Sequence, residues 1–454
     1  MDMEFKNKNI VFLGIGGISM SALARLCYSL GANIFGTDIT DNENVQALKH
    51  DKIAKIKIGK APLLVKNADL VIFTNAIPKN DSDLKLAYRL HKKVYERATL
   101  LGILSCKYNN LIAISGTHGK TTTTALLGWI FYQAKLAPTV HIGGIAKNFD
   151  SNLKLGSRNY FITEACEYQK SFLHLNPHTT IINNIEMDHP DCYKDKNEIQ
   201  KAFLQLSRQT KDNLVINGDL LSKDGFNFKN TKTFGFDSSN DIYAKNIKSE
   251  QNITNFDIYA HGNKLGKIYT SLVGEHNIYN ILSAVCVAIV YHIDFDTIKT
   301  AILSFEGTKR RFENIYHGAF DLILDYAHHP SEISACINSA KKLKHNRLIG
   351  IFQPHTYSRT LALMPEFSKC FLGLDILFVL PTYPAREQTI MGGRAIDLFY
   401  NIQNVKSTQY FTTPNSINYT LDNVLQNGDI VLWLGAGDIE KFAREYAKTL
   451  VNIK

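Results

Sequence analysis

The sequence predicts an α/β protein built from three domains. Its 454 residues are too many for one ordinary hydrophobic core, so two or three domains are expected from length alone. Short apolar stretches, each followed by a glycine turn and a helix of apolar periodicity, recur along the chain and are typical of parallel βαβ units. One polar stretch with short alternating strands interrupts this pattern. We therefore expect mostly parallel sheets and one small antiparallel piece.

The first α/β segment predicts a Rossmann-like domain. Its predicted strands are short and apolar, at residues 10–13, 33–36 and 70–74. The glycine turn GIGGISM (14–20) separates the first strand from a predicted helix over residues 21–30. This order of strand, glycine turn, helix and strand is that of a βαβ unit. We expect a boundary near residues 105–110 and a first domain over residues 1–107.

The remainder of the chain predicts two further α/β domains, over residues 108–312 and 313–454. Strands of the central domain are expected at residues 111–114, 160–163 and 180–184. The polar stretch 225–267, which contains FDIYA (256–260), is interpreted as the small antiparallel piece, and a helix over 279–292 closes this domain. Strands of the last domain, which we expect to be Rossmann-like, are predicted near residues 322–324, 348–352, 376–379 and 431–434.

Composition places the chain among ordinary globular proteins. Apolar residues make up 45% and charged residues 20%. The absence of a long basic run argues against a nucleic-acid-binding tail. The net charge of +9 would suit an anionic small substrate. Seven scattered cysteines without a C-x-x-C pair argue for a reducing compartment. No signal-peptide pattern and no apolar run of membrane-spanning length is visible. We expect a cytoplasmic protein with neither membrane nor nucleic acid as a partner.

The stretch SGTHGKTTTT (115–124) has the character of a phosphate-binding loop. Gly116 and Gly119 let backbone N–H groups turn towards one anion, and the following helix adds its N-terminal dipole. Lys120 can reach β- and γ-phosphates, and Thr121 places a hydroxyl where Mg²⁺ sits in such loops. Two residues separate the glycines, fewer than in the general P-loop pattern. A glycine turn with an incidental lysine is the alternative, but the flanking strand and helix favour nucleotide binding.

Candidate magnesium ligands follow two other predicted strands. Glu164 follows YFIT (160–163), and the cluster EMDHPD (186–191), which contains His189, follows TIINN. The carboxyl ends of parallel strands meet at one edge of a sheet, so these groups converge on the phosphate loop. Taken singly, an acidic residue at a strand end is as often a helix cap as a metal ligand. A single histidine such as His189 is more often hydrogen-bonded to the protein than bound to a metal. Together with Thr121 they predict a Mg²⁺ site.

Motifs along nearly the whole chain resemble those of the Mur ligases, the ATP-dependent amide ligases of peptidoglycan synthesis. The central ATPase domain of that family is matched by GTHGKTTT, EACEYQKSFLHLNP (164–177) and NIEMDHPD (184–191). Further matching motifs are GIGGISMSALA (14–24), GEHNIYN (274–280), GTKRRFE (307–313), DYAHHPSE (325–332), FQPHTYSRT (352–360), TYPARE (382–387) and GAGDI (435–439). The joint pattern is far more specific than one glycine loop.

The resemblance implies a reaction. The motifs are most similar to those of the family member that joins L-alanine to the lactyl carboxylate of UDP-N-acetylmuramate. ATP phosphorylates this carboxylate, and the alanine amine attacks the resulting acyl phosphate. Since carboxylate and γ-phosphate are both anionic, the site must neutralise charge. The resemblance implies that ATP and Mg²⁺ are the cofactors. The residues implied in catalysis are Lys120, Glu164, His189, Arg311 and His328, and those at the metal are Thr121, Glu164 and His189.

The resemblance also implies an ATP site. Its residues would be Gly116, Thr117, His118, Gly119, Lys120, Thr121, Thr122, His276, Asn277, Asn280, Arg311 and Asp325. Asn277 and Asn280 would read adenine, because an amide offers a donor and an acceptor side by side and residues three apart share a helix face. Without the motif, either asparagine is more often a helix cap. A guanidinium suits the phosphate contact of Arg311.

Residues for the UDP-sugar are implied in the first domain: Gly14, Gly16, Gly17, Ile18, Ser19, Asp38, Thr74 and Asn75. Taken alone, the G-x-G-G turn with Asp38 closing the next strand is a weak dinucleotide fingerprint, and a nicotinamide oxidoreductase is the resulting rival. A dehydrogenase has no need of Lys120 and its threonines, however. The resemblance assigns the turn to the diphosphate of the UDP-sugar.

Amino-acid binding is implied for the last domain, at His328, His329, Arg359 and Arg386. An arginine can hold the alanine carboxylate through two hydrogen bonds. This chain has Thr356 where many relatives have arginine, so the carboxylate contact must come from Arg359 or Arg386. Pro190 and Lys60 are two further departures from the family pattern.

Three alternatives remain open from sequence. Within the family, a recycling ligase attaches a whole tripeptide to the same UDP-sugar. Outside it stand a P-loop switch or motor, which would hydrolyse ATP without any UDP-sugar, and the nicotinamide oxidoreductase. For the ligase we expect a monomer or weak homodimer whose domains close to keep water from the acyl phosphate.

Overall fold

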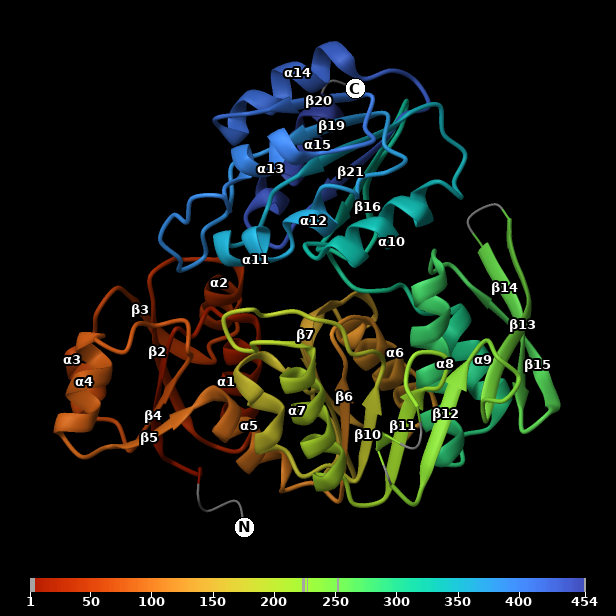
Figure 1. Ribbon diagram of the computed structural model, residues 1–454. Coiled ribbons are helices and arrows are strands. Elements are labelled where there is room, and N and C mark those ends of the chain that lie inside the picture. The colour runs from red at the N-terminus through yellow and green to blue at the C-terminus, as the bar shows by residue number, and fades with distance from the viewer. Residues whose placement is uncertain (1–4, 223–224, 227, 251–252, 453–454) are drawn as a thin grey trace.

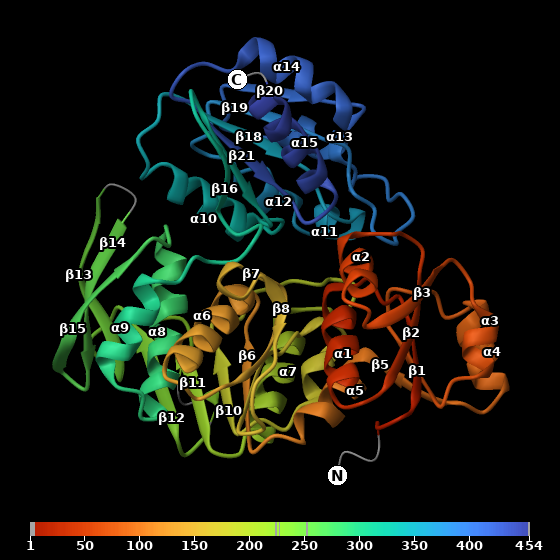
Figure 2. The same cartoon turned by 180° about the vertical axis from the view of Figure 1, so that it is seen from behind.

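The computed structural model describes residues 5–222, 225–226, 228–250 and 253–452. Three β-sheets follow one another along the chain, each covered by helices (Figure 1). The first two sheets lie side by side, and the third lies across them, above their junction (Figures 1 and 2). The predicted three-domain α/β fold is therefore confirmed. The sheets span residues 9–96, 110–270 and 313–434; the domain bounds drawn from sequence stay a prediction.

The N-terminal sheet is a Rossmann-like half, with parallel strands in the order β3-β2-β1-β4-β5. Its strands are β1 (Asn9–Leu13), β2 (Asn33–Asp38), β3 (Ala54–Ile58), β4 (Leu70–Phe73) and β5 (Lys93–Glu96). Its helices are α1 (Ile18–Ser29), α2 (Glu43–His50), α3 (Pro62–Lys66), α4 (Ser82–Arg89) and α5 (Arg97–Ser105). The apolar β1 lies at the centre, so the glycine turn after it stands where the strand order reverses, the usual ligand side of such sheets.

The central sheet has ten strands in the order β15-β14-β13-β12-β11-β10-β6-β9-β7-β8. They are β6 (Asn110–Ser115), β7 (Thr139–Ala146), β8 (Ser151–Lys154), β9 (Tyr160–Glu164), β10 (Thr179–Ile182), β11 (Asn213–Asn217), β12 (Thr231–Gly235), β13 (Ile242–Glu250), β14 (Ile253–Ala260) and β15 (Asn263–Thr270). Its α-helices are α6 (Lys120–Gln133), α7 (Lys196–Gln209), α8 (Glu275–Val290) and α9 (Phe295–Leu303), and the short 3-10 turns are Lys147–Phe149 and Tyr168–His174.

The antiparallel piece is real but shorter than predicted. Strands β13 to β15 pair antiparallel at one edge of the sheet, whereas β12 pairs in parallel with β11 and with the start of β13. The interpretation of the whole stretch 225–267 as antiparallel is therefore wrong for β12, which continues the parallel core. Residues 227, 251 and 252 of that stretch lie outside the described residues.

Helix α8 begins four residues before its predicted start. Gly274, at φ 100°, is the N-cap, so the first turn contains His276 and Asn277. The apolar periodicity from which the helix was predicted becomes regular only further along, because this first turn is polar. The difference matters because the polar turn carries two of the predicted ATP residues.

The C-terminal sheet has the order β16-β17-β21-β18-β19-β20 and is parallel except for the β16–β17 hairpin. Its strands are β16 (Glu313–His317), β17 (Asp321–Asp325), β18 (Leu348–Phe352), β19 (Ile376–Val379), β20 (Ser407–Tyr410) and β21 (Ile430–Leu434). The helices are α10 (Pro330–Ala340), α11 (Tyr357–Ala362), α12 (Met364–Phe367), α13 (Ala395–Asn401), α14 (Ile417–Val424) and α15 (Ile439–Asn452), with a 3-10 turn at Pro414–Ser416.

The last and first domains are each tied to the central one. Asn152 Nδ2 on β8 donates to Ile18 O at 2.6 Å and to Ser21 Oγ at 2.9 Å, which fastens α1 to the central sheet. On the other side, helix α10 of the C-terminal domain approaches the loop after β6 (Figure 2). Within the part of the chain that the structure describes, no helix is both long and apolar enough to cross a membrane.

Candidate active site

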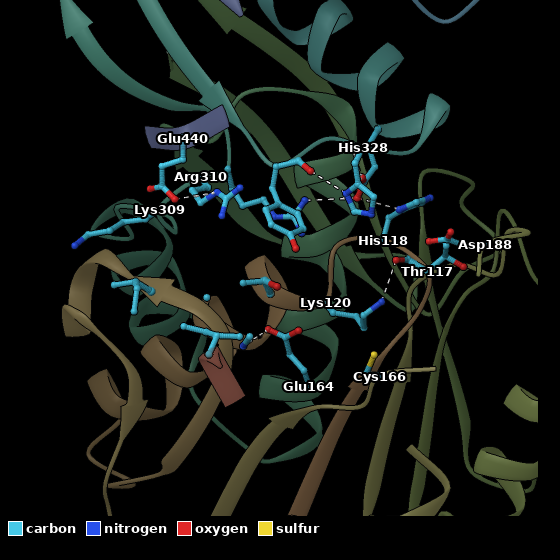
Figure 3. Close-up of a pocket in the computed structure, with 18 of the residues that line it drawn as sticks. Thr117, His118, Lys120, Glu164, Cys166, Asp188, Lys309, Arg310, His328 and Glu440 are labelled. Carbon is cyan, nitrogen blue, oxygen red and sulfur yellow. Dashed lines mark hydrogen bonds and ion pairs between the residues drawn. The ribbon is translucent and has the colours of Figure 1, made fainter. Parts of the chain in front are cut away.

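A cleft of about 640 Å³ lies where the three domains meet. Its walls include Ile18 and Asn42 from the N-terminal domain, Lys120 and Glu164 from the central domain, and His328 from the C-terminal domain (Figure 3). The carboxyl ends of β6 and β9 supply the floor, because Lys120 opens the helix after β6 and Glu164 ends β9. Groups far apart in sequence thus face one cavity, as the parallel topology requires.

The phosphate loop has the backbone that its glycines predicted. Gly116 and Gly119 have φ values of 137° and 83°, which residues with a side chain rarely adopt. A Cβ atom at Gly119 would also lie 2.2 Å from Asn280 Oδ1 of α8. Gly119 is the N-cap of α6, so the N–H groups of the first turn, at Lys120 and Thr121, are turned to the loop. The loop is therefore shaped to hold an anion.

Lys120 is paired inside the cleft. Its Nζ donates to Gly116 O at 2.5 Å and to Thr117 O at 3.0 Å, and lies 2.9 Å from Glu167 Oε2. Burial alone would raise the pKa of Glu167, whose side chain is 1% exposed, but the charges of Lys120 and His189 outweigh it and lower that pKa. Glu167 is thus a charged carboxylate buried beside the lysine.

Sequence reasoning gave Glu167 no role. The residue is part of EACEY (164–168), and its position three residues after Glu164 was the one feature of the sequence that could have indicated a role at the site. His189 Nε2 lies 3.5 Å from Glu167 Oε1, so one buried carboxylate contacts both Lys120 and His189. This connection between two predicted catalytic residues could not be read from the motif.

The predicted metal residues Thr121, Glu164 and His189 all line the cleft. Glu164 Oε1 accepts a hydrogen bond from Gly143 N at 2.6 Å, and burial raises the pKa of its carboxyl against the effects of Gly143, Lys120 and Thr121. A buried carboxylate beside a threonine hydroxyl suits a hard divalent cation, which would relieve the cost of its charge. The donor set therefore fits Mg²⁺.

A second cavity of about 210 Å³ lies between the phosphate loop, α8 and α10. The predicted ATP residues that line it are His118, Gly119, Thr122, His276, Asn277, Asn280, Arg311 and Asp325. Asn280 Nδ2 donates to Asn277 Oδ1 at 3.1 Å, so the two amides share a face as their spacing predicted. His276 lines the same cavity from the exposed first turn of α8.

Arg311 and Asp325 stand at the junction of the central and C-terminal domains. Arg311 Nη1 lies 3.5 Å from Glu332 Oε1 of α10. Asp325, at the end of β17, accepts hydrogen bonds from Phe312 N and Ala327 N, each at 2.7 Å. Burial raises the pKa of Asp325 to about 6 although Arg311 opposes it. Both residues line the second cavity, and their roles at the phosphates and at ATP stay predictions.

The four predicted amino-acid residues make different contacts. His328 lines the large cleft, and burial lowers its pKa to about 3. Arg359 is buried and its Nε donates to Asp188 Oδ1 at 3.0 Å. His329 is the N-cap of α10, and Arg386 is exposed, donating to Asn75 O of the N-terminal domain at 3.1 Å. Binding of an amino acid by these residues stays a prediction.

Residues predicted for the UDP-sugar lie around the turn after β1 and the ends of β2 and β4: Gly14, Gly16, Gly17, Ile18, Ser19, Asp38, Thr74 and Asn75. Asp38 Oδ2 accepts a hydrogen bond from Gly16 N at 2.8 Å, so it supports the turn itself. Ser19 Oγ lies 2.9 Å from Nε2 of the buried His141 on β7, and Asn75 Nδ2 donates to Glu96 Oε1 at 2.6 Å. Ile18 lines the large cleft.

Three family models match this chain in order: the Mur ligase family, catalytic domain, over residues 9–109; the Mur ligase middle domain over residues 114–288; and the Mur ligase, glutamate ligase domain, over residues 310–437. The chain belongs to the Mur ligase family. The resemblance inferred from the motifs is thereby confirmed.

Curated relatives of this Mur ligase match it over almost its whole length. The UDP-N-acetylmuramate–L-alanine ligase of Clostridium beijerinckii is 38% identical over 457 residues, which is 98% of this chain and 98% of the relative. A protein of the same name from Clostridium botulinum strain Hall is 39% identical over 461 residues, covering 97% and 98% of the two chains.

Solved structures with the same fold are also known. The UDP-N-acetylmuramate-alanine ligase of Thermotoga maritima superimposes with a TM-score of 0.85 over 99% of this Mur ligase and 100% of its own chain, at 24% identity. A murein peptide ligase from Psychrobacter arcticus gives a TM-score of 0.72 with the same coverage and identity. At this identity, both support the fold alone.

The three departures from the family pattern lie in different places of this Mur ligase. Lys60 forms an ion pair with Asp81 inside the N-terminal domain. Thr356, before α11, has φ 67°, which is unusual for a β-branched residue, and its N–H donates to Tyr383 O at 2.9 Å. Pro190 follows His189, which has φ 55°. At position 356, an arginine would have to adopt the same positive φ as Thr356.

Proposed function

We propose that this Mur ligase uses ATP to join L-alanine to the lactyl carboxylate of UDP-N-acetylmuramate, in the synthesis of peptidoglycan precursors. One observation carries the proposal: a single cleft is lined by the phosphate-loop Lys120, by the predicted magnesium residues Glu164 and His189, and by His328 of the last domain. Three domains meeting at one cleft suit three substrates. Relatives of that name at 38% and 39% identity over the full length support it.

Phosphate binding falls to the loop after β6. The backbone N–H groups in the first turn of α6, from Lys120 to Thr122, would face the anion, and Lys120 adds a charge. Lys120, oriented by its contact with Glu167, would reach the β- and γ-phosphates when ATP binds. Arg311, at the wall between the two cavities, adds a guanidinium on the other side of the phosphates.

Thr121, Glu164 and His189 would hold Mg²⁺, and a bound ion would neutralise the charge that builds up between the attacking carboxylate and the γ-phosphate. Glu167 stands behind this group and keeps Lys120 and His189 in place through its two contacts. The protein thus opposes two anions with fixed positive charge before they meet.

His328 orients the incoming amine. Its Nδ1 lies 2.9 Å from the carbonyl oxygen of Tyr326, so Nδ1 carries the proton and donates it there. The other ring nitrogen, Nε2, therefore keeps a lone pair that can accept a hydrogen bond from the amine of the amino acid. Because burial lowers the pKa of His328 to about 3, the ring stays neutral and does not repel an ammonium substrate.

Water must be kept from the acyl phosphate, since hydrolysis would waste ATP. Tyr326, His328 and Glu332 of the C-terminal domain line the cleft together with residues of the central domain, and Figure 3 shows His328 above Lys120 and Glu164. Domain contact therefore both completes the site and excludes solvent. We propose that this enzyme acts in the cytoplasm as a monomer or weak homodimer.

The test measures phosphate release from ATP and Mg²⁺ with UDP-N-acetylmuramate and either L-alanine or the tripeptide. We expect release that requires both the sugar nucleotide and L-alanine, and its loss in Lys120→Ala with binding of the UDP-sugar retained. Release with the tripeptide instead of alanine would assign the recycling activity. Release that ignores both substrates would contradict the ligase and favour a nucleotide switch, and turnover of Lys120→Ala within about tenfold of the parent would remove Lys120 from the mechanism.

A further inference from the structure

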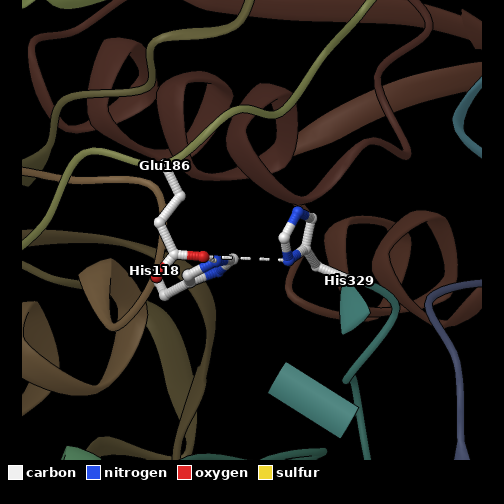
Figure 4. Close-up of side chains that lie close together, drawn as sticks. All are labelled: His118, Glu186 and His329. Atoms are coloured by element: carbon white, nitrogen blue, oxygen red, sulfur yellow. Dashed lines mark hydrogen bonds and ion pairs between the residues drawn. The ribbon is translucent and has the colours of Figure 1, made fainter. Parts of the chain in front are cut away.

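A cluster of two histidines and a glutamate lies outside the predicted magnesium site, between the central and C-terminal domains (Figure 4). His118 belongs to the phosphate loop, Glu186 follows β10, and His329 caps α10. His118 Nε2 lies 3.3 Å and His329 Nδ1 lies 4.0 Å from Glu186 Oε2. One ligand atom from each residue lies within 4.8 Å of the other two.

Both imidazole rings are held through the nitrogen that points away from this cluster. His329 Nε2 lies 3.1 Å from the carbonyl oxygen of Met187, so it donates a proton there and Nδ1 keeps its lone pair, which accepts a hydrogen bond from Ser331 N at 3.3 Å. His118 Nδ1 lies 3.1 Å from Glu332 Oε1, a carboxylate that accepts its proton. Histidines that ligate metals are oriented in this way, by a carbonyl or carboxylate on the distal nitrogen.

We propose that His118, Glu186 and His329 form a second divalent-cation site, suited to Zn²⁺. Two imidazole nitrogens and one carboxylate oxygen are the ligands that Zn²⁺ favours, whereas Mg²⁺ prefers oxygen ligands throughout. A fourth ligand is at hand, because Ser331 Oγ lies 3.1 Å from His118 Nε2 and 2.8 Å from His329 Nδ1. The site differs in all its ligands from Thr121, Glu164 and His189.

The ion has access to the site and a consequence when bound. The Glu186 side chain is 41% exposed, so the cluster opens to solvent. An ion takes the place of the proton that His118 Nε2 shares with Glu186. Since His118 and Glu186 belong to the central domain and His329 to the C-terminal domain, one bound ion fastens the two domains together. We expect Zn²⁺ to stabilise the closed arrangement and to slow turnover, which requires opening.

The experiment uses the full chain, freed of metal with a chelator and titrated with Zn²⁺ alone by calorimetry. We expect binding of one ion that persists in excess Mg²⁺, and a weakening of at least about tenfold in Glu186→Gln. Glu445→Gln, an exposed glutamate of α15, is the matched control and should bind like the parent. Equal affinity in the parent and in Glu186→Gln, or displacement of Zn²⁺ by Mg²⁺, would overturn the proposal.

Two further measurements place the ion and do not depend on catalysis. Co²⁺ should give the visible absorption of four-coordinate nitrogen and oxygen ligation in the parent, and His329→Gln should lose it while keeping its far-ultraviolet circular dichroism. His189→Gln should keep the Co²⁺ spectrum and the Zn²⁺ affinity. Loss of both in His189→Gln would instead place the ion at the predicted magnesium residues and refute the second site. Neither result depends on whether L-alanine is the substrate.

Discussion

Arg359 of the C-terminal domain and Asp188 of the central domain form a buried ion pair, with 3.0 Å between Nε and Oδ1. Their side chains are 6% and 5% exposed. Burial alone would raise the pKa of Asp188, but the guanidinium of Arg359 and the neighbouring histidines hold it well below its usual range. Asp188 directly precedes His189, so the pair connects the last domain to the predicted magnesium site.

This pair should show strong coupling in a double-mutant cycle of Arg359→Met and Asp188→Asn. Arg359→Met leaves the carboxylate of Asp188 buried without its partner, and Asp188→Asn does the same to the guanidinium of Arg359. Each single change should therefore lower the free energy of unfolding by about 3 kcal/mol. The double variant should cost less than the sum, because no unpaired charge remains. Chemical denaturation of the four proteins measures this coupling. Strictly additive effects would show that the two side chains do not stabilise one another.

Gly119→Ala should weaken ATP binding by at least about tenfold. The new Cβ would lie 2.2 Å from Asn280 Oδ1 and would also occupy a backbone at φ 83°. Gly59→Ala separates the two effects, since Gly59 has φ 89° but no atom within 4 Å of its Cβ position. The control should lose about 1 kcal/mol of stability and bind ATP like the parent. Calorimetric titration with ATP checks both; similar affinities in the two variants would show that the collision is harmless.

Glu167→Gln should lower kcat about a hundredfold and change the KM for ATP by less than tenfold. The buried carboxylate contacts Lys120 at 2.9 Å and His189 at 3.5 Å, so its loss leaves both side chains in the cleft without the contact that orients them. Glu167→Asp should recover part of the rate, and Glu445→Gln should not change it. Steady-state kinetics with ATP varied is the measurement. A change in KM with kcat intact would show that Glu167 acts on binding and not on orientation.

Asp325 should make stability fall as the pH rises from about 4 to about 6. Burial raises its pKa to about 6 from 3.8, with Glu332 adding to the shift and Arg311 opposing it. An acid whose folded-state pKa is raised stabilises the fold below its unfolded pKa, and this contribution is lost as it ionises. A pKa raised by about two corresponds to about 3 kcal/mol in the free energy of unfolding.

Asp325→Asn removes this titration. Relative to the parent, its free energy of unfolding should therefore rise by about 3 kcal/mol between pH 4 and pH 7. Urea denaturation at several pH values, without ATP or metal, gives this difference. A difference that does not vary with pH would mean that Asp325 keeps its ordinary pKa in the folded protein.

Much of the site could be predicted from local patterns. Gly116, Gly119 and Lys120 follow a buried strand directly, and a loop of that composition between strand and helix admits few conformations, so its shape followed from the sequence. Asn277 and Asn280 share a face because their spacing matches the helix period. The bounds of α8 and the parallel pairing of β12 were less predictable, since a polar first turn and a polar strand carry no apolar periodicity.

By itself, the sequence determined the three-domain α/β fold, the phosphate loop and the family, because each depends on local conformation or on motifs of adjacent residues. Tertiary structure alone decided that Glu167 contacts Lys120 and His189, that Arg359 reaches Asp188, and that His118 meets Glu186 and His329. These contacts join residues of different strands and domains. Their geometry depends on how the sheets pack against one another, and side-chain burial then sets the charges, neither of which a local pattern contains.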